Sequence, residues 1–586
     1  MCRTRCGSRA RRVSPSPCRG AAVRADLGFR EPRARPGQSP REGAHRHARP
    51  VPSARRGHRR VRCPRVRPAR PVRHGGWTGS AVARTAHAAP HARGARRGDR
   101  GGHDARPCRH AAAHGHRGPG VLRPDRRGRL RVERPGRQAR EVPRRRPGLR
   151  RSLRALAAVG RPVTRPTAAV VGAGVSGLTA AYLLQKTHDV TLFESEPRLG
   201  GHAHTHDVET PDDRVVPIDT GFIVHNERTY PNLLRLFAEL GVATQPTEMS
   251  MSISCGGCGL EYAGARGLPG VFAQKKQLAN PRYLKMLTEV TRFHAQARRL
   301  LAAADAGTGF DGLTLGAFLA LGGYSDYFVR HFMVPVVSCV WSSGTGLSLQ
   351  YPAEYLFRFL ANHGMLSVSG SPQWRTVTGG SRAYVEKAAK GLTAVQTGAG
   401  VRSLTRHPDG VQLVDGDGER HEADVVVVAT HPDQALRLLG DPTDAERAAL
   451  GAFSYSRNET VLHTDSTVLP RAQAARSSWN YRMGACDQQV EAVQVTYWMN
   501  RLHAIDEPLD YLVTLNGTDR VPAGSVLRRM VYEHPLYTPE SVAAQRLLPA
   551  LNTGRTAFAG AYHGWGFHED GCASGVRAAE SLGSGW

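Results

Sequence analysis

The first 166 of the 586 residues contain no lysine, isoleucine or tyrosine. Valine, leucine and phenylalanine together number 19, about 11% of this segment, beside 46 arginines and 8 acidic residues. A segment so poor in apolar side chains and so highly charged cannot bury enough apolar surface to offset chain entropy. We therefore expect residues 1–166 to form a disordered extension rich in Arg, Pro, Gly and Ala.

This extension also lacks the apolar core of roughly 7–15 residues that a signal peptide needs. An arginine-rich tail can bind nucleic acid through phosphates, but stacking on single strands needs aromatic side chains, and only Phe29 and Trp77 are present. A wrongly assigned start in GC-rich DNA explains Arg without any Lys, because GC-rich codons encode Arg, Pro, Gly and Ala. We favour this second interpretation, expect translation to begin near Val159 or Val163, and expect no nucleic-acid partner.

The positive charge of the chain is confined to the extension. The whole chain carries a net charge of +32, whereas residues 167–586 hold 35 basic and 41 acidic residues, a net of −6. These 420 residues contain five cysteines and no apolar run of the roughly 20 residues that would span a membrane. Few thiols and no recognisable export signal indicate a reducing compartment, so we expect a cytoplasmic protein.

Residues 167–194 have the pattern of a dinucleotide-binding βαβ unit. A β-branched run, Thr167–Val171, precedes Gly172-Ala-Gly-Val-Ser-Gly177, then a helical stretch over 178–185 and a second strand pattern, Asp189–Glu194. The spacing of 22 from Gly172 to Glu194 is close to the roughly 20 expected between the glycine turn and a ribose-binding acid. The glycines permit a tight turn and close approach to a pyrophosphate at a helix N-terminus. The segment therefore predicts a dinucleotide site.

Motifs further along the chain indicate which dinucleotide is bound. Glu194 is followed by Pro197-Arg-Leu-Gly-Gly-His202, and residues 424–430 and 556–560 read as buried strands, the second leading through Asp570-Gly571 into a helix expected over 572–582. With these motifs the chain resembles the flavin-containing amine oxidase and phytoene desaturase superfamily. That resemblance implies FAD as the cofactor.

More narrowly, the chain resembles a bacterial family of predicted FAD/NAD(P)-binding oxidoreductases. The likeness covers roughly residues 167–583. Its marks are four strings, at residues 219–232, 478–482, 496–501 and 560–571.

The resemblance implies an α/β fold, in which a Rossmann-like FAD-binding domain of the glutathione-reductase-like kind carries an inserted α+β substrate domain. Both domains are expected to be discontinuous in sequence. The FAD-binding parts are expected at 167–228, 367–435 and 551–586, and the substrate-domain parts at 229–366 and 436–550.

Carried onto this sequence, the resemblance implies roles for a set of cofactor-binding residues. The acid Glu194 is expected on the ribose, the glycine motifs at the pyrophosphate, residues 220–221 near the isoalloxazine, Val401 at adenine, and the C-terminal segment along the flavin and ribityl chain. His202 stands where the superfamily often has Arg. The full set is Gly172, Ala173, Gly174, Ser176, Gly177, Glu194, Gly200, Gly201, His202, Thr220, Gly221, Val401, Gly560, Asp570, Gly571 and Ala573.

No strong acid–base pair stands out, as expected where the cofactor carries the redox chemistry. His563 and His568 are the candidate catalytic residues, placed to move a proton beside the flavin; the alternative is that both hydrogen-bond structurally within a Gly-rich loop. Cys255-Gly-Gly-Cys258 is half a zinc site, a redox pair or a turn with two free thiols. A closed zinc site needs two more ligands, and the next cysteine is Cys339, so we expect no metal.

We expect an FAD-dependent oxidoreductase that takes hydride from a substrate carbon. Relatives are commonly encoded near, or fused to, cyclopropane-fatty-acid synthases, so the resemblance implies a small hydrophobic or lipid acyl substrate, a methyltransferase of that type as partner, and peripheral contact with a membrane. The apolar segment 328–341 is compatible with such a substrate. Two alternatives remain open: an amine oxidase, marked by an aromatic pair facing the flavin, and a non-catalytic flavin-binding scaffold of a lipid-modifying complex.

Overall fold

The computed structural model describes residues 165–309, 312–368 and 370–586, all within one compact unit. The expected disordered extension, apart from its last two residues, and the expected start near Val159 or Val163 lie outside the described residues.

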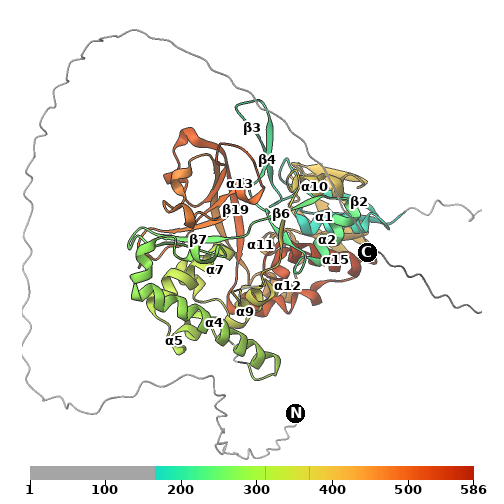
Figure 1. Cartoon of the computed structure of the whole chain (residues 1–586). Helices are drawn as coiled ribbons and strands as arrows, with labels where there is room; N and C mark the ends of the chain where they lie inside the picture. The colour runs from blue at the N-terminus through green and yellow to red at the C-terminus, as the bar shows by residue number, and fades with distance from the viewer. Residues whose placement is uncertain (1–164, 310–311, 369) are drawn as a thin grey trace, which may run out of the picture. The chain divides into compact units, whose positions relative to one another are not determined.

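A five-stranded parallel sheet forms the centre of the FAD-binding domain (Figure 1). Its strands β1 and β14 are buried along almost their whole length, which explains why both read as continuous apolar runs. The predicted α/β, Rossmann-like fold is therefore confirmed. The strand order is β10 (Ala394–Thr397), β2 (Asp189–Glu194), β1 (Thr167–Val171), β14 (Val425–Val428) and β20 (Thr556–Phe558).

Helices cover one face of this sheet, and a small antiparallel sheet covers the other. The helical layer consists of α1 (Val175–Leu184), α2 (Pro231–Leu240), α10 (Arg382–Ala389) and α15 (His568–Ser581). The opposite layer consists of β11 (Ser403–His407), β12 (Gly410–Val414) and β13 (Arg420–Ala423), with α11 (Pro432–Leu438), α12 (Asp444–Leu450) and α14 (Pro539–Gln545). The parallel strands thus end between two packed layers, at the edge where ligands bind in folds of this kind.

The C-terminal helix begins earlier than the sequence pattern predicts. It starts at His568 instead of Cys572, because the Asp570 carboxylate accepts a hydrogen bond of 2.9 Å from the backbone N–H of Phe567. This cap satisfies one of the free N–H groups of the first turn. Figure 1 shows α15 beside α1 and α2.

The substrate domain is built around a seven-stranded mixed sheet that takes strands from both insertions. Only the β7–β16 pair in this sheet is parallel. The strand order is β19 (Val526–Leu536), β15 (Ser454–His463), β18 (Leu512–Leu515), β17 (Gln494–Trp498), β16 (Trp479–Met483), β7 (Met251–Cys255) and β8 (Glu261–Gly264).

A group of helices packs against this sheet and forms an aromatic-rich core with it. The apolar segment expected at 328–341 continues from α6 (Asp326–Phe328) through a π-helical turn, η2 (Val329–Met333), into α7 (Val334–Trp341). Neighbouring helices, coloured from green to yellow in Figure 1, are α4 (Pro281–Asp305), α5 (Leu315–Leu321) and α9 (Ala353–Asn362).

Shorter strands connect the two domains. The hairpin β3 (Thr205–Glu209) and β4 (Val215–Asp219) and the three-stranded sheet β5 (His225–Asn226), β9 (Trp374–Val377) and β6 (Thr244–Thr247) carry the chain between them. Among the helices of the described part of the chain, none has the length and apolar character needed to cross a membrane.

Candidate active site

One large cavity runs from the edge of the parallel sheet into the substrate domain. Its volume is about 1580 Å³, above the roughly 300–1,000 Å³ of ordinary small-molecule pockets. The glycine turn and Glu194 border one end, and residues of α4, η2, α7 and α9 border the other. A cavity of this size accommodates a dinucleotide and a second molecule together.

The turn after β1 has the shape that a pyrophosphate requires. Gly172 has a φ of +100°, and a Cβ on it would lie 2.7 Å from the carbonyl oxygen of Ala429. A Cβ on Gly177 would lie 1.8 Å from the oxygen of Gly172, so glycine there lets α1 pack on the turn. A Cβ on Gly174 would meet no atom within 4 Å, and no side chain caps the helix at this residue. The first N–H groups of α1 are therefore available to an anion.

Glu194 lines the end of the cavity where the adenosine half of the cofactor is expected. Its carboxylate accepts hydrogen bonds from the backbone N–H groups of Ala173 (2.8 Å) and Glu196 (2.9 Å) and from the Ser195 hydroxyl (3.1 Å). A carboxylate has about four lone-pair sites, so it can still accept from ribose hydroxyls. Val401, expected at adenine, also lines this end.

A cation lies beside the second glycine pair. The Arg198 guanidinium donates to the carbonyl oxygen of Gly201 at 2.8 Å, pairs with Glu196 at 3.0 Å and lines the cavity. A Cβ on Gly201 would lie 3.2 Å from the Cα of Gly174, so glycine at this position lets the second glycine pair pack directly against the turn after β1. Arg198 is absent from the set of residues predicted to bind the cofactor, although it stands in the string Pro197-Arg-Leu-Gly-Gly-His202.

Asp219 holds the segment that approaches the flavin position. Its buried carboxylate accepts hydrogen bonds from the Thr205 hydroxyl (2.6 Å) and from the backbone N–H and hydroxyl of Ser381 (2.9 and 2.7 Å). Thr220 and Gly221, which follow it directly, line the cavity. Asp219 is thus a positioning residue for the predicted pair.

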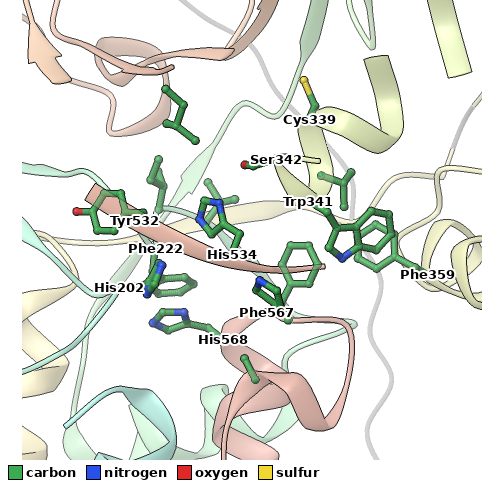
Figure 2. A pocket seen from close by; sticks show the side chains of 18 of the residues that line it. His202, Phe222, Cys339, Trp341, Ser342, Phe359, Tyr532, His534, Phe567 and His568 are labelled. Atoms are coloured by element: carbon green, nitrogen blue, oxygen red, sulfur yellow. The ribbon is translucent and has the colours of Figure 1, made fainter. Parts of the chain in front are cut away.

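Three histidines gather on one side of the pocket, and Trp341 and Phe359 lie on the other (Figure 2). Burial lowers the pKa of His202 well below 6.5 and the pKa of His534 to about 4. Both rings are therefore neutral at neutral pH in the protein without its cofactor. The third, His568, stacks on Phe222 with ring centroids 3.7 Å apart.

Aliphatic and aromatic side chains line the substrate end. Trp341 is fixed there by a hydrogen bond of 2.9 Å from its Nε1 to the carbonyl oxygen of Trp565. The acidic residues among the described residues that line the cavity are Glu194, Glu196 and Glu533, and Glu533 pairs with His431 at 3.3 Å, next to β14. Lining residues from α4, η2, α7 and α9 include Val290, Phe293, Met333, Val336, Phe359 and Leu360.

A family model described as flavin containing amine oxidoreductase matches residues 175–582. This chain belongs to that family. Solved structures with a similar fold include cyclohexylamine oxidase from Brevibacterium oxydans IH-35A, at a TM-score of 0.51 and 17% identity over 71% of this chain and 98% of that chain. A fatty acid isomerase from P. acnes is similar at a TM-score of 0.50 and 18% identity, over 70% and 97% of the two chains.

A curated relative matches this chain over a much shorter segment than the family model does. Tryptophan 2-monooxygenase from Allorhizobium ampelinum is 52% identical over 44 residues, which are 7% of this chain and 6% of that protein. The matched segment thus spans a small part of the curated relative.

The family and the site agree on the cofactor and the class of enzyme. The protein is an FAD-dependent oxidoreductase that acts on a small molecule, as the sequence predicts. The residues present fit FAD. The glycine turn and the N-terminus of α1 would hold the pyrophosphate, Arg198 would offset its negative charge, and Glu194 would accept hydrogen bonds from the ribose. When bound, FAD supplies the hydride acceptor.

Eleven of the sixteen residues predicted to bind the cofactor line the cavity. The five that do not line it in the described part of the chain are Gly177, Gly200, Asp570, Gly571 and Ala573. A Cβ on Gly571 would lie 2.6 Å from Cγ1 of Val175 and 3.0 Å from the hydroxyl of Ser176. Gly571 therefore permits close packing of α15 on α1.

The structure separates the two candidate catalytic histidines. His568 lines the cavity, and its Nε2 shares a hydrogen bond of 3.1 Å with the hydroxyl of Tyr384. His563 does not line the cavity, and its buried Nε2 has no hydrogen-bond partner among the residues that the structure describes. Burial lowers the pKa of both histidines to about 3.

Proposed function

We propose that this flavoenzyme removes a hydride from the acyl chain of a lipid. The observation that carries the proposal is the substrate end of the cavity, which is mainly apolar and is lined by residues of α4, η2, α7 and α9. Burial of apolar surface stabilises a bound chain by about 0.8 kcal/mol for each CH₂ group. Such a lining gives affinity to a hydrocarbon and little to a polar molecule.

The same lining disfavours an amine substrate. Burying an unpaired ammonium group costs far more than the roughly 0.5–2 kcal/mol that aromatic faces such as those of Trp341 and Phe359 return, so an amine needs a carboxylate there. Among the described lining residues, the three glutamates lie at the cofactor end or next to β14. The fold alone does not distinguish an amine from a lipid substrate, because similar folds occur in a cyclohexylamine oxidase and in a fatty acid isomerase. The side chains of the site are therefore the basis for the distinction.

Apolar side chains are exposed at the edge of the cavity. Leu268 in α3 (Gly267–Val271) is 74% exposed and Val368 is 85% exposed, and both line the cavity. Exposed apolar residues that gather at a site are found at ligand-binding grooves and at membrane or protein contacts. They support the expected peripheral contact with a membrane. An acyl substrate also suits the expected methyltransferase partner, which modifies the same kind of chain.

The side chains beside the flavin position then serve to orient and to exclude water. A general base works best with a pKa near the working pH, so His568, with a pKa lowered to about 3, holds its place between Phe222 and Tyr384 and takes up no proton. When bound, FAD would supply the two-electron acceptor for the substrate hydride, and the proton released with it would pass to water at the open edge of the cavity.

Anaerobic mixing of the flavinated protein with lipids and with amines tests this proposal. We expect acyl lipids to bleach the oxidised flavin absorbance and amines to leave it unchanged. Bleaching by amines alone would establish an amine oxidase instead. Bleaching by neither, in protein that dithionite reduces, would favour the flavin-binding scaffold.

A pair of variants on α4 tests whether the acyl chain binds in the substrate end of the cavity. Val290→Phe places a ring in the cavity and should slow bleaching by long acyl chains about tenfold, equivalent to about 1.4 kcal/mol. Thr288→Phe adds the same ring at an exposed position of the helix and should leave the rate unchanged. Equal rates in both variants would place the acyl chain elsewhere.

A further inference from the structure

Four metal-ligating side chains meet at one edge of the substrate domain, outside the residues that line the FAD cavity. Cys255 ends β7 and Cys258 stands in the turn that follows, while His331 comes from η2 and Cys486 from the loop after β16. Their Sγ and Nε2 atoms all lie within 4.8 Å of one another. The fold thus joins residues that are 73 and 231 positions apart in the chain.

We propose that Cys255, Cys258, His331 and Cys486 bind one Zn²⁺ ion. The Sγ atoms of Cys255 and Cys486 are 3.6 Å apart, and Sγ of Cys258 is 3.6 Å from Nε2 of His331. Tetrahedral zinc, with bonds of about 2.3 Å to sulfur and about 2.0–2.1 Å to nitrogen, places its ligand atoms about 3.6–3.8 Å apart. These two pairs therefore have about the separation that the ion requires, and the remaining pairs lie within 4.8 Å. A disulfide would need about 2.05 Å between the sulfurs.

The surroundings of His331 favour metal binding through Nε2. Its Nδ1 lies 3.2 Å from the carbonyl oxygen of Tyr327, and its ring stacks on the Tyr327 ring with centroids 4.2 Å apart. A histidine that donates its other N–H to a carbonyl is the usual arrangement around zinc, because this contact fixes both the tautomer and the ring plane.

The glycines between the cysteines bring the two loops into contact. The N–H of Gly256 donates to the carbonyl oxygen of Met483 at 2.8 Å, and a Cβ on this glycine would lie 2.5 Å from the oxygen of Gly484. A Cβ on Gly257 would lie 2.9 Å from the backbone nitrogen of Cys486. Side chains at either position would force the loops, and with them the thiols, apart.

The ligand set indicates a structural zinc ion. Three thiols and one imidazole suit zinc over calcium or magnesium, and four protein ligands leave no open position for a substrate. Cys258 is exposed and Cys486 is half-buried, so the ion can enter from solvent. Binding would join β7, η2 and the loop after β16. Ile253 of β7 and Met333 of η2 line the cavity, so the ion would hold the walls of the substrate end together.

Metal analysis of the full-length flavinated chain, purified without chelators or an affinity metal, tests the assignment. We expect one zinc ion per chain, and most of it lost in Cys258→Ser and in Cys486→Ser. The matched control is Cys572→Ser, because Cys572 is buried in α15 with its Sγ 3.5 Å from the Thr179 hydroxyl. This control should retain the full zinc content.

Cobalt gives an independent readout that does not depend on the variants. Unsubstituted protein exchanged into Co²⁺ should show the d–d bands of a tetrahedral thiolate site in the red, where oxidised flavin does not absorb. Zinc removal should also lower the melting temperature, and added Zn²⁺ should restore it. The proposal is overturned by metal-free protein that shows no such cobalt spectrum, by zinc retained in both cluster variants, or by a Cys255–Cys486 disulfide in peptide mapping.

Discussion

Replacing Glu194 by alanine should lower both the unfolding free energy of the apoprotein and its affinity for FAD. The change removes the acceptor for the N–H groups of Ala173 and Glu196. Hydrogen bonds to a charged group contribute about 1.5–3 kcal/mol each, but water in the cavity can replace part of both, so we expect a loss of about 1–2 kcal/mol in unfolding free energy. Loss of the acceptor for two ribose hydroxyls should cost a further ~3 kcal/mol of binding, about a hundredfold in Kd.

Denaturant unfolding of apoprotein and titration with FAD measure the two effects separately. Glu194→Gln is the matched control, because its amide oxygen still accepts from one N–H group while the carboxylate charge is gone. Its losses should fall between those of the unchanged protein and those of Glu194→Ala. Unchanged FAD affinity in Glu194→Ala would refute the ribose assignment, and unchanged apoprotein stability would refute the role in the turn.

Three further predictions concern residues near the cofactor. Arg198→Ala should weaken FAD binding about tenfold or more and make the Kd less dependent on salt. Titration with FAD at two salt concentrations measures both effects. An unchanged Kd would show that Arg198 does not contact the phosphates. Gly571→Val should lower the melting temperature with little change in flavin potential, because its side chain meets Val175; a shifted potential in a stable variant would contradict this. Burial raises the pKa of Asp570 to about 7, so the carboxyl group keeps its proton in the folded protein at pH values where the unfolded chain has lost it. This group therefore contributes its full stabilisation below about pH 4, and the contribution is lost as the pH rises towards 7. Asp570→Asn should make the melting temperature depend less on pH in this range.

Local patterns account for the parts of the protein that could be predicted from the sequence. The Gly172 turn, the buried strands and the acid at Glu194 lie within one βαβ unit, where spacing and residue type determine the backbone. Side-chain identity also identifies the class of cofactor, because a pyrophosphate needs glycine and a helix N-terminus within a few residues. The sequence pattern places the start of α15 four residues too late, because apolar periodicity does not reveal the hydrogen bond from the N–H of Phe567 to the Asp570 carboxylate.

Local patterns, together with the family resemblance that they carry, therefore predict the FAD-binding fold, the cofactor and the class of enzyme. The packing of the folded chain establishes which side chains lie together: His568 lines the cavity and His563 does not, the substrate end is apolar, and Cys486 and His331 meet Cys255 and Cys258. The physical reason is the range of the interactions. Turns and helix ends depend on neighbours a few residues away, whereas a cavity or a four-ligand site depends on how strands and helices far apart in the chain pack together.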